Sequence, residues 1–229
     1  MKKLFNYFTK FEIGLWTSSV LIIIGTFIVF EDKNFLTLVA SLVGATFLVL
    51  NAKGNPIGQL LTIIFSIIYG VISYRFAYYG EMITYLCMSM PIAFVALISW
   101  LKNPYEKGKA EVKVNKLSKV EIILMFMFTA IVTVIFYFIL KYFNTANLIP
   151  STFSVTTSFM AAYLTFRRSP YFALAYAMND LVLIVLWVLA SITEISYLSV
   201  VICFIVFFVN DMYGFINWKR MEKRQKLNM

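Results

Sequence analysis

The sequence predicts an all-α integral membrane protein with eight transmembrane helices. Of its 229 residues, 61% are hydrophobic and only 14% are charged, which excludes an ordinary water-soluble domain. Eight apolar stretches come close to the roughly 20 residues that one helical crossing of a bilayer requires. They lie at about 13–30, 35–50, 57–76, 82–100, 122–143, 152–166, 171–190 and 196–217. The second and sixth are short and rich in small or hydroxylated residues, so we expect them to line a polar feature.

The basic residues indicate how these helices are oriented. With the amino terminus in the cytoplasm, all but three of the 20 Lys and Arg residues fall on the cytoplasmic side, the exceptions being Lys33, Arg75 and Lys141. Cytoplasmic loops of membrane proteins are enriched in Lys and Arg, so we expect both termini to be cytoplasmic. The first apolar segment lacks a small-residue cleavage site and is expected to be a retained helix. The basic loop at 102–119 serves as an orientation signal that can also bind anionic membrane lipids.

The residue types that are missing or rare exclude most catalytic chemistry. The chain has no histidine, which removes the commonest metal ligand and the usual proton carrier near neutral pH. Its two cysteines, Cys87 and Cys203, lie in apolar segments and are expected to be buried hydrophobes. The positive charge is a topology signal and does not predict a nucleic-acid partner. We therefore expect no catalytic residue, no metal site and no cofactor.

Two acidic dipeptides in the last two apolar segments point to transport. Asn179-Asp180 and Asn210-Asp211 are embedded in stretches that are otherwise apolar. An ionisable side chain at membrane depth costs several kcal/mol unless it faces a partner or a polar cavity, so such residues mark functional sites. Proton coupling, a structural polar network in a non-transporting scaffold, and an intramembrane aspartyl protease that pairs Asp180 with Asp211 are the alternatives. The glycine-flanked aspartates of such proteases are absent.

The third apolar segment carries a polar stripe. Its members are Gln59, Thr62, Ser66, Tyr69 and Ser73, at intervals of three and four residues, which places them on one helical face. Hydrogen bonds between helices explain the Ser and Thr members as well as a substrate does. Gln59 and Tyr69 are larger, and with Thr62 they are our predicted substrate contacts in this segment.

The seventh and eighth segments complete the predicted substrate site. Tyr176 and Asn179 share a face with Asp180 beside them, and an aromatic ring together with an amide suits a planar, base-like ligand. In the eighth segment, Asn210 and Asp211 are joined by Tyr213 as predicted contacts.

Two further residues are candidates for a gate or hinge. Pro91 lies inside the fourth segment, where proline removes one backbone hydrogen bond and creates either a hinge or a static kink. Trp187 lies about two turns beyond Asn179 on the seventh segment. We predict that these two residues move when the site opens.

A weak internal repeat divides the chain into two halves. Asn55-Pro56 opens the third segment as Ser169-Pro170 opens the seventh, 114 residues later, and Trp100 ends the fourth segment as Trp218 ends the eighth, 118 residues later. Four spans separate the copies, so the halves have the same orientation. Parallel repeats of this kind bind substrate between them near the middle of the membrane.

Two motifs resemble the PnuC family of bacterial vitamin and nucleoside transporters. The stretch from Asn210 to Lys219, NDMYGFINWK, is similar to the N-x-x-Y-G-x-x-N-W-K end of that family's last helix, and Phe76 to Glu81 resembles its Y-G-E turn. The resemblance covers about residues 35–220. It implies two parallel three-helix bundles joined by a linking helix, as in the SWEET sugar transporters, with one extra N-terminal helix. The implied units are an N-terminal helix at 1–33, a first repeat at 34–101, a loop and linking helix at 102–147, a second repeat at 148–220 and a basic tail at 221–229.

The resemblance also implies a function. Members of the family are facilitators, and a cytoplasmic kinase that forms no stable complex with the transporter traps the substrate by phosphorylation. Nicotinamide riboside is the default substrate, and relatives carry thiamine, riboflavin or deoxynucleosides. The riboside motif W-x-x-W-x-x-N corresponds here to Ala173, Tyr176 and Asn179. Because a cationic ring gains from tryptophan faces, this change makes a deoxynucleoside an almost equal alternative, unless Asp180 compensates. The expected location is the bacterial inner membrane, and a homo-oligomer is compatible with the sequence.

Overall fold

The computed structural model describes residues 7–30, 35–75 and 79–228, and for Arg75 the backbone only. Within these residues the regular elements are helices, with one isolated β-bridge between Pro104 and Val112. The predicted all-helical membrane architecture is confirmed. Lys2, Lys3, Lys33 and the first three residues of the Y-G-E stretch, 76–78, lie outside the described residues.

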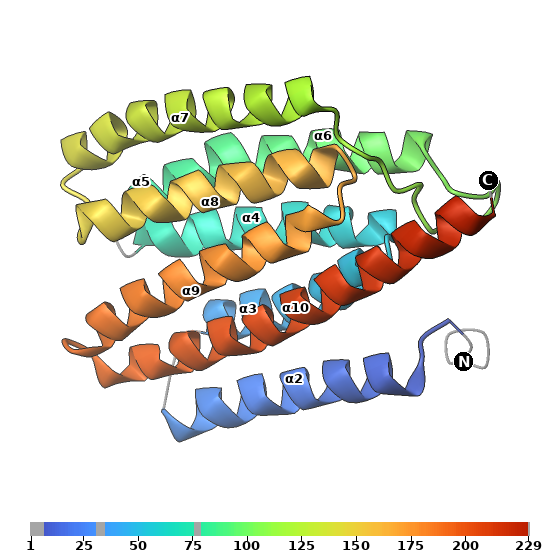
Figure 1. Cartoon of the computed structure of the whole chain (residues 1–229). Coiled ribbons are helices and arrows are strands. Elements are labelled where there is room, and N and C mark those ends of the chain that lie inside the picture. The colour runs from blue at the N-terminus through green and yellow to red at the C-terminus, as the bar shows by residue number, and fades with distance from the viewer. Residues whose placement is uncertain (1–6, 31–34, 76–78, 229) are drawn as a thin grey trace.

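Each of the eight predicted segments is helical (Figure 1). The helices are α2 (Lys10–Val29), α3 (Phe35–Ala52), α4 (Pro56–Arg75), α5 (Tyr79–Ile83), the π-helix η1 (Thr84–Ser89), α6 (Met90–Lys102), α7 (Lys119–Tyr142), α8 (Leu148–Phe166), α9 (Tyr171–Ser191), the 3-10 turn η2 (Ile195–Tyr197) and α10 (Leu198–Leu227). Together, α5, η1 and α6 form the fourth segment. Seven segments of the described chain are long and apolar enough to cross a membrane. The remaining one is α8, whose many hydroxyl side chains lower its hydropathy.

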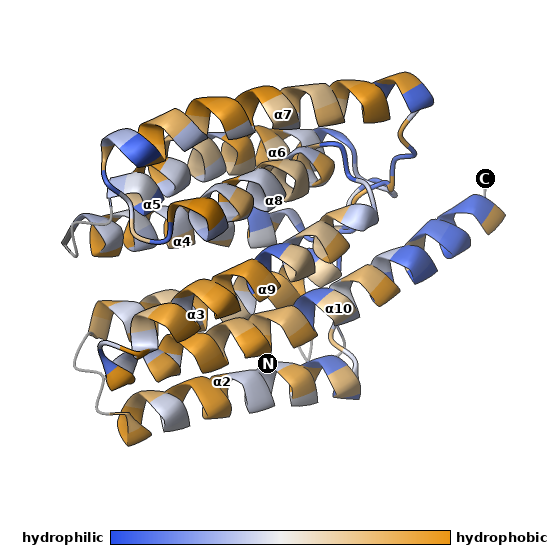
Figure 2. Ribbon diagram, turned by 60° about the vertical axis from the view of Figure 1, so that its left-hand side comes forward, coloured by the Kyte–Doolittle hydropathy of each residue, from blue (hydrophilic) through white to orange (hydrophobic). Residues whose placement is uncertain are grey.

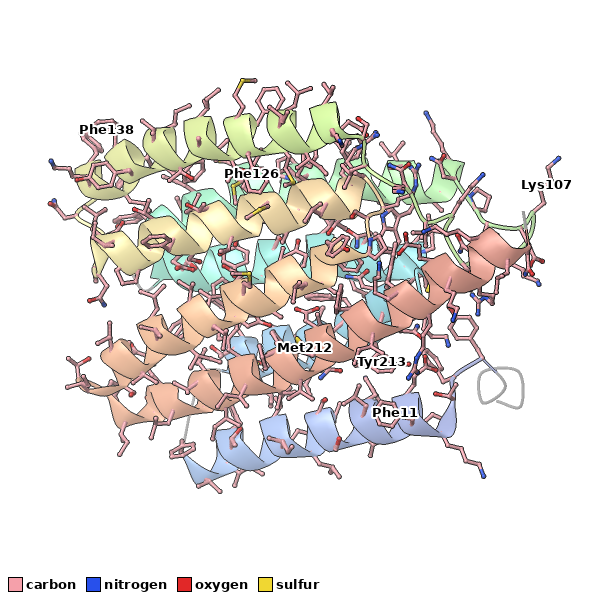
Figure 3. The ribbon with its side chains drawn as sticks, viewed as in Figure 1. Phe11, Lys107, Phe126, Phe138, Met212 and Tyr213 are labelled. Carbon is pink, nitrogen blue, oxygen red and sulfur yellow. The ribbon has the colours of Figure 1, made fainter. Side chains whose placement is uncertain are left out.

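Six of the helices form a ring. In one half α4 packs between α3 and α6, in the other α9 packs between α8 and α10, and contacts of α10 with α3 and of α6 with α8 close the ring. Outside it, α2 packs on α3 and α10, and α7 packs on α8. Apolar side chains such as Phe138 of α7 project away from the bundle (Figure 3), as a surface in contact with lipid requires.

The two ends of the bundle differ in polarity. The linker at 103–118, the start of α2 and the end of α10 lie at one end, which we call the linker end, and hydrophilic residues gather there (Figure 2). The opposite end, with the α4–α5, α7–α8 and α9–α10 connections, is called the loop end. The predicted tail at 221–229 is mostly helical, because α10 continues to Leu227. Its Gln225 accepts a hydrogen bond from the backbone N–H of Val114 in the linker (2.8 Å).

At the linker end, the two halves are joined by reciprocal tryptophan hydrogen bonds. Trp100 donates from Nε1 to the carbonyl oxygen of Thr165 (2.9 Å), and Trp218 donates to that of Asn51 (2.8 Å). The two tryptophans are 118 residues apart, and the two residues whose carbonyls accept these bonds are 114 residues apart. The sequence repeat has the same two offsets. Thus the last helix of each half is bonded to the end of the first helix of the other half. The two indole rings lie 5.4 Å apart and are fully buried.

The linker also contacts both halves at equivalent turns. Val112 donates its N–H to the carbonyl of Gly54, and Asn115 donates to that of Arg168, each over 3.0 Å. Gly54 and Arg168 are 114 residues apart, and both have positive φ, at 64° and 56°. Glycine adopts this conformation without strain, whereas arginine rarely does. The linker therefore straps the two halves together across this end.

Helix α2 has a counterpart in α7. Glu12 of α2 forms an ion pair with Lys53 after α3 (3.0 Å), and Glu121 of α7 forms one with Arg167 after α8. Lys53 and Arg167 are again 114 residues apart, and each glutamate closes the capping box at the start of its helix. The additional first helix, α2, is therefore attached to the first repeat by the same kind of ion pair that attaches the linking helix, α7, to the second repeat.

Truncating one tryptophan tests the contact between the halves. We expect Trp218→Ala to reduce the free energy of unfolding by about 3–5 kcal/mol, because it removes a buried ring and one of the two hydrogen bonds that the carbonyl of Asn51 accepts. Thermal unfolding of the purified protein in detergent measures the change. The control is Trp16→Ala, since Trp16 is 41% exposed on α2. Equal stability of the two variants would contradict the assignment.

Candidate functional site

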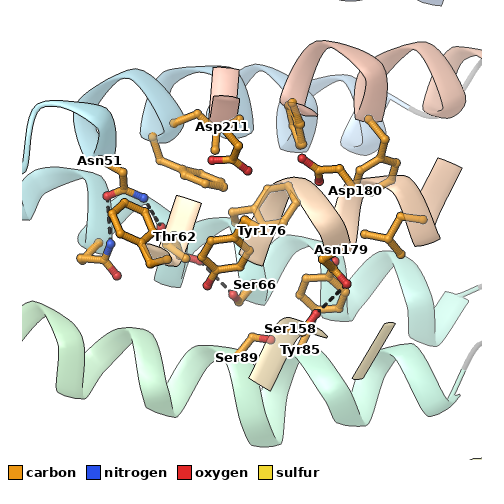
Figure 4. A pocket seen from close by; sticks show the side chains of 18 residues that line it. Asn51, Thr62, Ser66, Tyr85, Ser89, Ser158, Tyr176, Asn179, Asp180 and Asp211 are labelled. Atoms are coloured by element: carbon orange, nitrogen blue, oxygen red, sulfur yellow. Dashed lines mark hydrogen bonds between the residues drawn. The ribbon is translucent and has the colours of Figure 1, made fainter. Parts of the chain in front are cut away.

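A cavity lies between the two halves, and helices of both halves form its wall (Figure 4). We call it the central cavity. Its polar lining residues are Asn51, Gln59, Thr62, Ser66, Tyr85 and Ser89 from the first half and Ser158, Tyr176, Asn179, Asp180 and Asp211 from the second. The apolar part of the wall consists of five phenylalanines and two leucines, Phe47, Phe65, Phe172, Phe204, Phe207, Leu48 and Leu183. Aromatic faces next to amides and carboxylates suit a planar, polar ligand.

The central cavity is narrow. Its volume of about 70 Å³ holds a few water molecules. Pockets for ligands of drug size measure about 300–1,000 Å³. A solute as large as a nucleoside therefore does not fit in the central cavity of this structure.

The predicted residues Gln59 and Thr62 do line the cavity, where they form with Asn51 a hydrogen-bonded chain of two amides and one hydroxyl, which we call the amide chain. Gln59 donates from Nε2 to Oδ1 of Asn51 (2.9 Å), and Nδ2 of Asn51 lies 3.5 Å from Oγ1 of Thr62. Asn51 is a site residue that the sequence reasoning missed. It is in the last turn of α3, two residues before the Lys-Gly-Asn-Pro turn begins, so it has the sequence context of a loop residue.

Asn179 is held by the hydroxyl face of α8. Its Oδ1 accepts hydrogen bonds from Thr157 (2.8 Å), Ser158 (3.1 Å) and Ser154 (3.3 Å). Helix–helix bonding thus accounts for the oxygen of Asn179 and for much of the hydroxyl content of α8. No described residue accepts a hydrogen bond from Nδ2 of Asn179, which leaves this donor for a ligand.

The two aspartates converge on the central cavity. Asp180 of α9 and Asp211 of α10 are each only 5% exposed, and their carboxyl groups interact with each other. The Oδ2 atom of Asp180 has no hydrogen-bonding partner among the described residues. No Lys or Arg of the described chain lines this cavity. Its formal charges are therefore all acidic, which favours a cationic solute and opposes an anionic one.

The predicted tyrosines occupy different positions. Tyr176 lines the cavity, with its ring 6.4 Å from that of Phe172. Tyr69 lies behind the wall, where it stacks on Phe65 (5.6 Å) and contacts the ring of Tyr85 (4.4 Å). Tyr69 therefore positions Tyr85, a lining residue that no sequence pattern singled out.

Asn210 and Tyr213 lie outside the cavity, in contrast to the prediction. Asn210 donates from Nδ2 to Oγ of Ser19 (2.9 Å), and Tyr213 donates its hydroxyl proton to Glu12 (2.8 Å). Both bonds hold α2 against α10, and Tyr213 is at this junction in Figure 3. The reason is geometric, since Asn210 is turned by about 100° from Asp211 around α10, and on this helix that turn directs its side chain to α2.

Neither gate candidate lines the central cavity. Pro91 follows the π-helix η1, in which the N–H of Met90 bonds to the carbonyl of Tyr85, five residues earlier. Proline has no N–H and its ring clashes with the carbonyl four residues before it, which accounts for the wider turn. Trp187 lines a separate cavity at the loop end. The hinge and gate roles stay predictions.

The linker end of the cavity is closed by aromatic rings. Phe172 lines the cavity and contacts Trp218 (4.9 Å) and Trp100 (6.2 Å) on its other side. Val112 of the linker is fully buried in the same cluster. The two tryptophans and Phe172 thus separate the central cavity from the linker end. The sequence reasoning used these residues only as repeat markers.

Comparison with known proteins identifies relatives over nearly the whole chain. The family described as Nicotinamide mononucleotide transporter matches residues 34–220. A protein named Nicotinamide riboside transporter PnuC, from Neisseria mucosa, is 26% identical over 227 residues, which cover 97% of this chain and 86% of that protein. The solved structure described as Crystal structure of the Vitamin B3 transporter PnuC has a TM-score of 0.81 and 25% identity, covering 95% of this chain and 94% of the other.

A pair of glycine substitutions tests the amide chain. A methyl group at Gly58 would overlap the side chain of Asn51, whereas nothing lies within 4 Å of one at Gly25. We expect Gly58→Ala to lower the melting temperature by displacing Asn51 and hence Gln59. Gly25→Ala should leave it unchanged or raise it, because alanine favours a helix by up to about 1 kcal/mol relative to glycine. Equal effects in thermal unfolding would contradict the close approach at Gly58.

Proposed function

This chain belongs to the nicotinamide mononucleotide transporter, or PnuC, family, and we propose that it carries a nucleoside-like cation, nicotinamide riboside, across the membrane. Membership makes it a multi-pass membrane transporter and not an enzyme. It also removes the aspartyl protease alternative, which the proximity of Asp180 and Asp211 alone does not exclude. The observation that supports the substrate best is the aromatic central cavity with two buried carboxylates and no basic side chain among its described lining residues.

Charge separates the candidate substrates. Nicotinamide riboside has a positively charged pyridinium ring, which the carboxylates of Asp180 and Asp211 attract. A mononucleotide carries a phosphate of about −1.5 to −2 charges near neutral pH, which the same carboxylates repel. A deoxynucleoside is neutral and gains only from the aromatic rings and the amides, so it is the second candidate.

The substituted riboside motif is compatible with this proposal. Ala173 is fully buried, and a Cβ atom added at Gly214 would lie 3.4 Å from its own Cβ atom. A small residue at position 173 therefore allows α9 and α10 to pack closely. Tyr176 lines the central cavity together with Phe47, Phe65 and Phe207. Tyrosine and phenylalanine rings also attract cations, though less strongly than tryptophan. In this chain, aromatic rings of both halves thus take the place of the two motif tryptophans.

We propose facilitated diffusion through rocking of two parallel repeats, 34–101 and 148–220, joined by 102–147. The basic linker end is placed in the cytoplasm, with both termini, in a bacterial inner membrane. Asn51, Gln59, Thr62, Tyr176, Asn179, Asp180 and Asp211 contact the substrate, and Tyr69, Asn210 and Tyr213 position the wall. A cytoplasmic kinase that phosphorylates the substrate would trap it inside.

A ligand screen tests the substrate. A ligand that binds only the folded protein raises its melting temperature. We expect nicotinamide riboside to stabilise the wild type more than thymidine, deoxyadenosine, thiamine, riboflavin or the mononucleotide. Asp180→Asn keeps the side-chain shape and should weaken riboside binding by roughly 30-fold or more, the lower end for removing one partner of a buried charge pair. Stabilisation by thymidine alone would favour the deoxynucleoside, and unchanged riboside binding by the variant would contradict the charge argument.

Exchange in proteoliposomes tests the mechanism. With riboside on both sides, one cation enters for each that leaves, so no net charge moves. We expect a protonophore to leave this exchange rate unchanged, because a facilitator has no coupled proton. Collapse of exchange on adding the protonophore would instead assign proton transfer to Asp180 or Asp211.

A further inference from the structure

We propose that Glu81 and Trp187 form a second site for organic cations at the loop end, through which a positively charged substrate reaches the central cavity. We call it the vestibule site. Its role in transport rests on the proposed function, whereas its binding of cations does not.

The two residues come from different halves and line one cavity. Glu81 belongs to α5 and Trp187 to α9, and the cavity between them measures about 70 Å³. Thr145, Asn147 and Ser151 complete its polar wall. A carboxylate next to a tryptophan ring is the combination that recognises organic cations, because the charge attracts them and the ring face binds them by cation–π contact.

The carboxylate of Glu81 is available for a ligand. It makes no hydrogen bond or ion pair with any described residue, and no Lys or Arg of the described chain lines the vestibule site. An acidic side chain within a membrane-spanning segment is costly without a partner, which favours a functional role. A bound cation would supply the missing partner.

Gly80 explains how Glu81 reaches this position. A methyl group at Gly80 would overlap Leu140 of α7 and lie 2.6 Å from Oγ1 of Thr145. Only glycine therefore lets α5 approach the α7–α8 connection this closely. The glycine of the Y-G-E motif thus brings Glu81 next to Thr145 and Ser151.

A small hydroxyl-lined cavity, which we call the neck, lies between the vestibule site and the central cavity and shares wall residues with both. Its volume is about 10 Å³, room for about one water molecule, and it shares Glu81, Thr145 and Ser151 with the vestibule site. It shares Tyr85 and Ser158 with the central cavity. Tyr85 belongs to the π-helix η1, and π-helical turns are frequent at functional sites. The three cavities thus form a series from the loop end to the middle of the bundle, which we call the route, and polar side chains of the described chain line each of them.

All formal charges that line this route in the described chain are negative. Glu81 lies at its outer part, and Asp180 and Asp211 lie at its inner end. A cleft with one sign of charge raises the local concentration of opposite charges and speeds their association. The vestibule site therefore favours cations over neutral solutes before they reach the central cavity, and it opposes phosphorylated ones.

Cation binding is measured first, without transport. The probe is 1-methylnicotinamide, a pyridinium ion that quenches tryptophan fluorescence on stacking, with uncharged nicotinamide as its control. We expect saturable quenching in the wild type that is lost in Trp187→Phe and weakened on the order of threefold to tenfold in Glu81→Gln. Glu81→Asp, which keeps the charge, should retain more quenching than Glu81→Gln. Melting temperatures verify that each variant is folded.

The matched control is Glu194→Gln. Glu194 is an exposed carboxylate at the same end of the bundle and lines none of the three cavities of the route. It should quench like the wild type. Saturable quenching that Glu81→Gln leaves unchanged would overturn the vestibule site, and so would the absence of any contribution from Trp187.

The second measurement is initial uptake into proteoliposomes at low salt. Nicotinamide riboside is compared with its uncharged dihydropyridine form, which has the same ribose and carboxamide. Glu81→Gln should slow uptake of the cation on the order of threefold to tenfold and change that of the neutral form less than about twofold. Equal losses for both forms would indicate a structural role and overturn the proposal. A wild type that shows the quenching but transports no riboside would contradict the proposed function and still support the cation site.

Discussion

The reciprocal bonds of Trp100 and Trp218 are the interaction on which the arrangement of the two halves depends. Each indole reaches from the last helix of one half to the first helix of the other, and the aromatic cluster that the two rings form with Phe172 closes the central cavity at the linker end. In a membrane, such contacts cannot rely on the hydrophobic effect between helices, so packing and directed hydrogen bonds carry the association. The linker adds bonds to both halves at equivalent turns, which means that opening this end requires several coupled changes.

The second constraint is the cost of buried charge. Asp180 and Asp211 interact inside the ring of helices, and no basic side chain of the described lining neutralises them. In a purely structural network, a nearby Lys or Arg would offset this cost. The cationic substrate that we propose would offset this cost only during transport, and the stability of the closed state would then depend on the charge of the substrate.

The polar stripes have structural and functional roles at the same time. The hydroxyls of α8 hold the oxygen of Asn179, while the same residue leaves its amide donor toward the cavity. On α4, Gln59 is fixed by Asn51, and both line the cavity. The wall is thus pre-organised by hydrogen bonds between helices. Within one side chain, one polar atom can bond to a neighbouring helix while another stays available for a ligand.

The sequence by itself determined the eight helical segments, because length and hydropathy are local properties to which the bilayer responds directly. Its repeat and its charge pattern predicted two parallel halves and their orientation. It also indicated that Gln59, Tyr176, Asn179 and the two aspartates lie on polar faces. The periodicity of polar residues along a helix does not predict which other helix or cavity a polar face will contact. Only the tertiary structure decided that Asp211 faces the cavity while Asn210 and Tyr213 hold α2, and that Asn51, Tyr85 and the two tryptophans shape the site. Those assignments depend on contacts between residues far apart in the chain, which only the packing of the helices brings together.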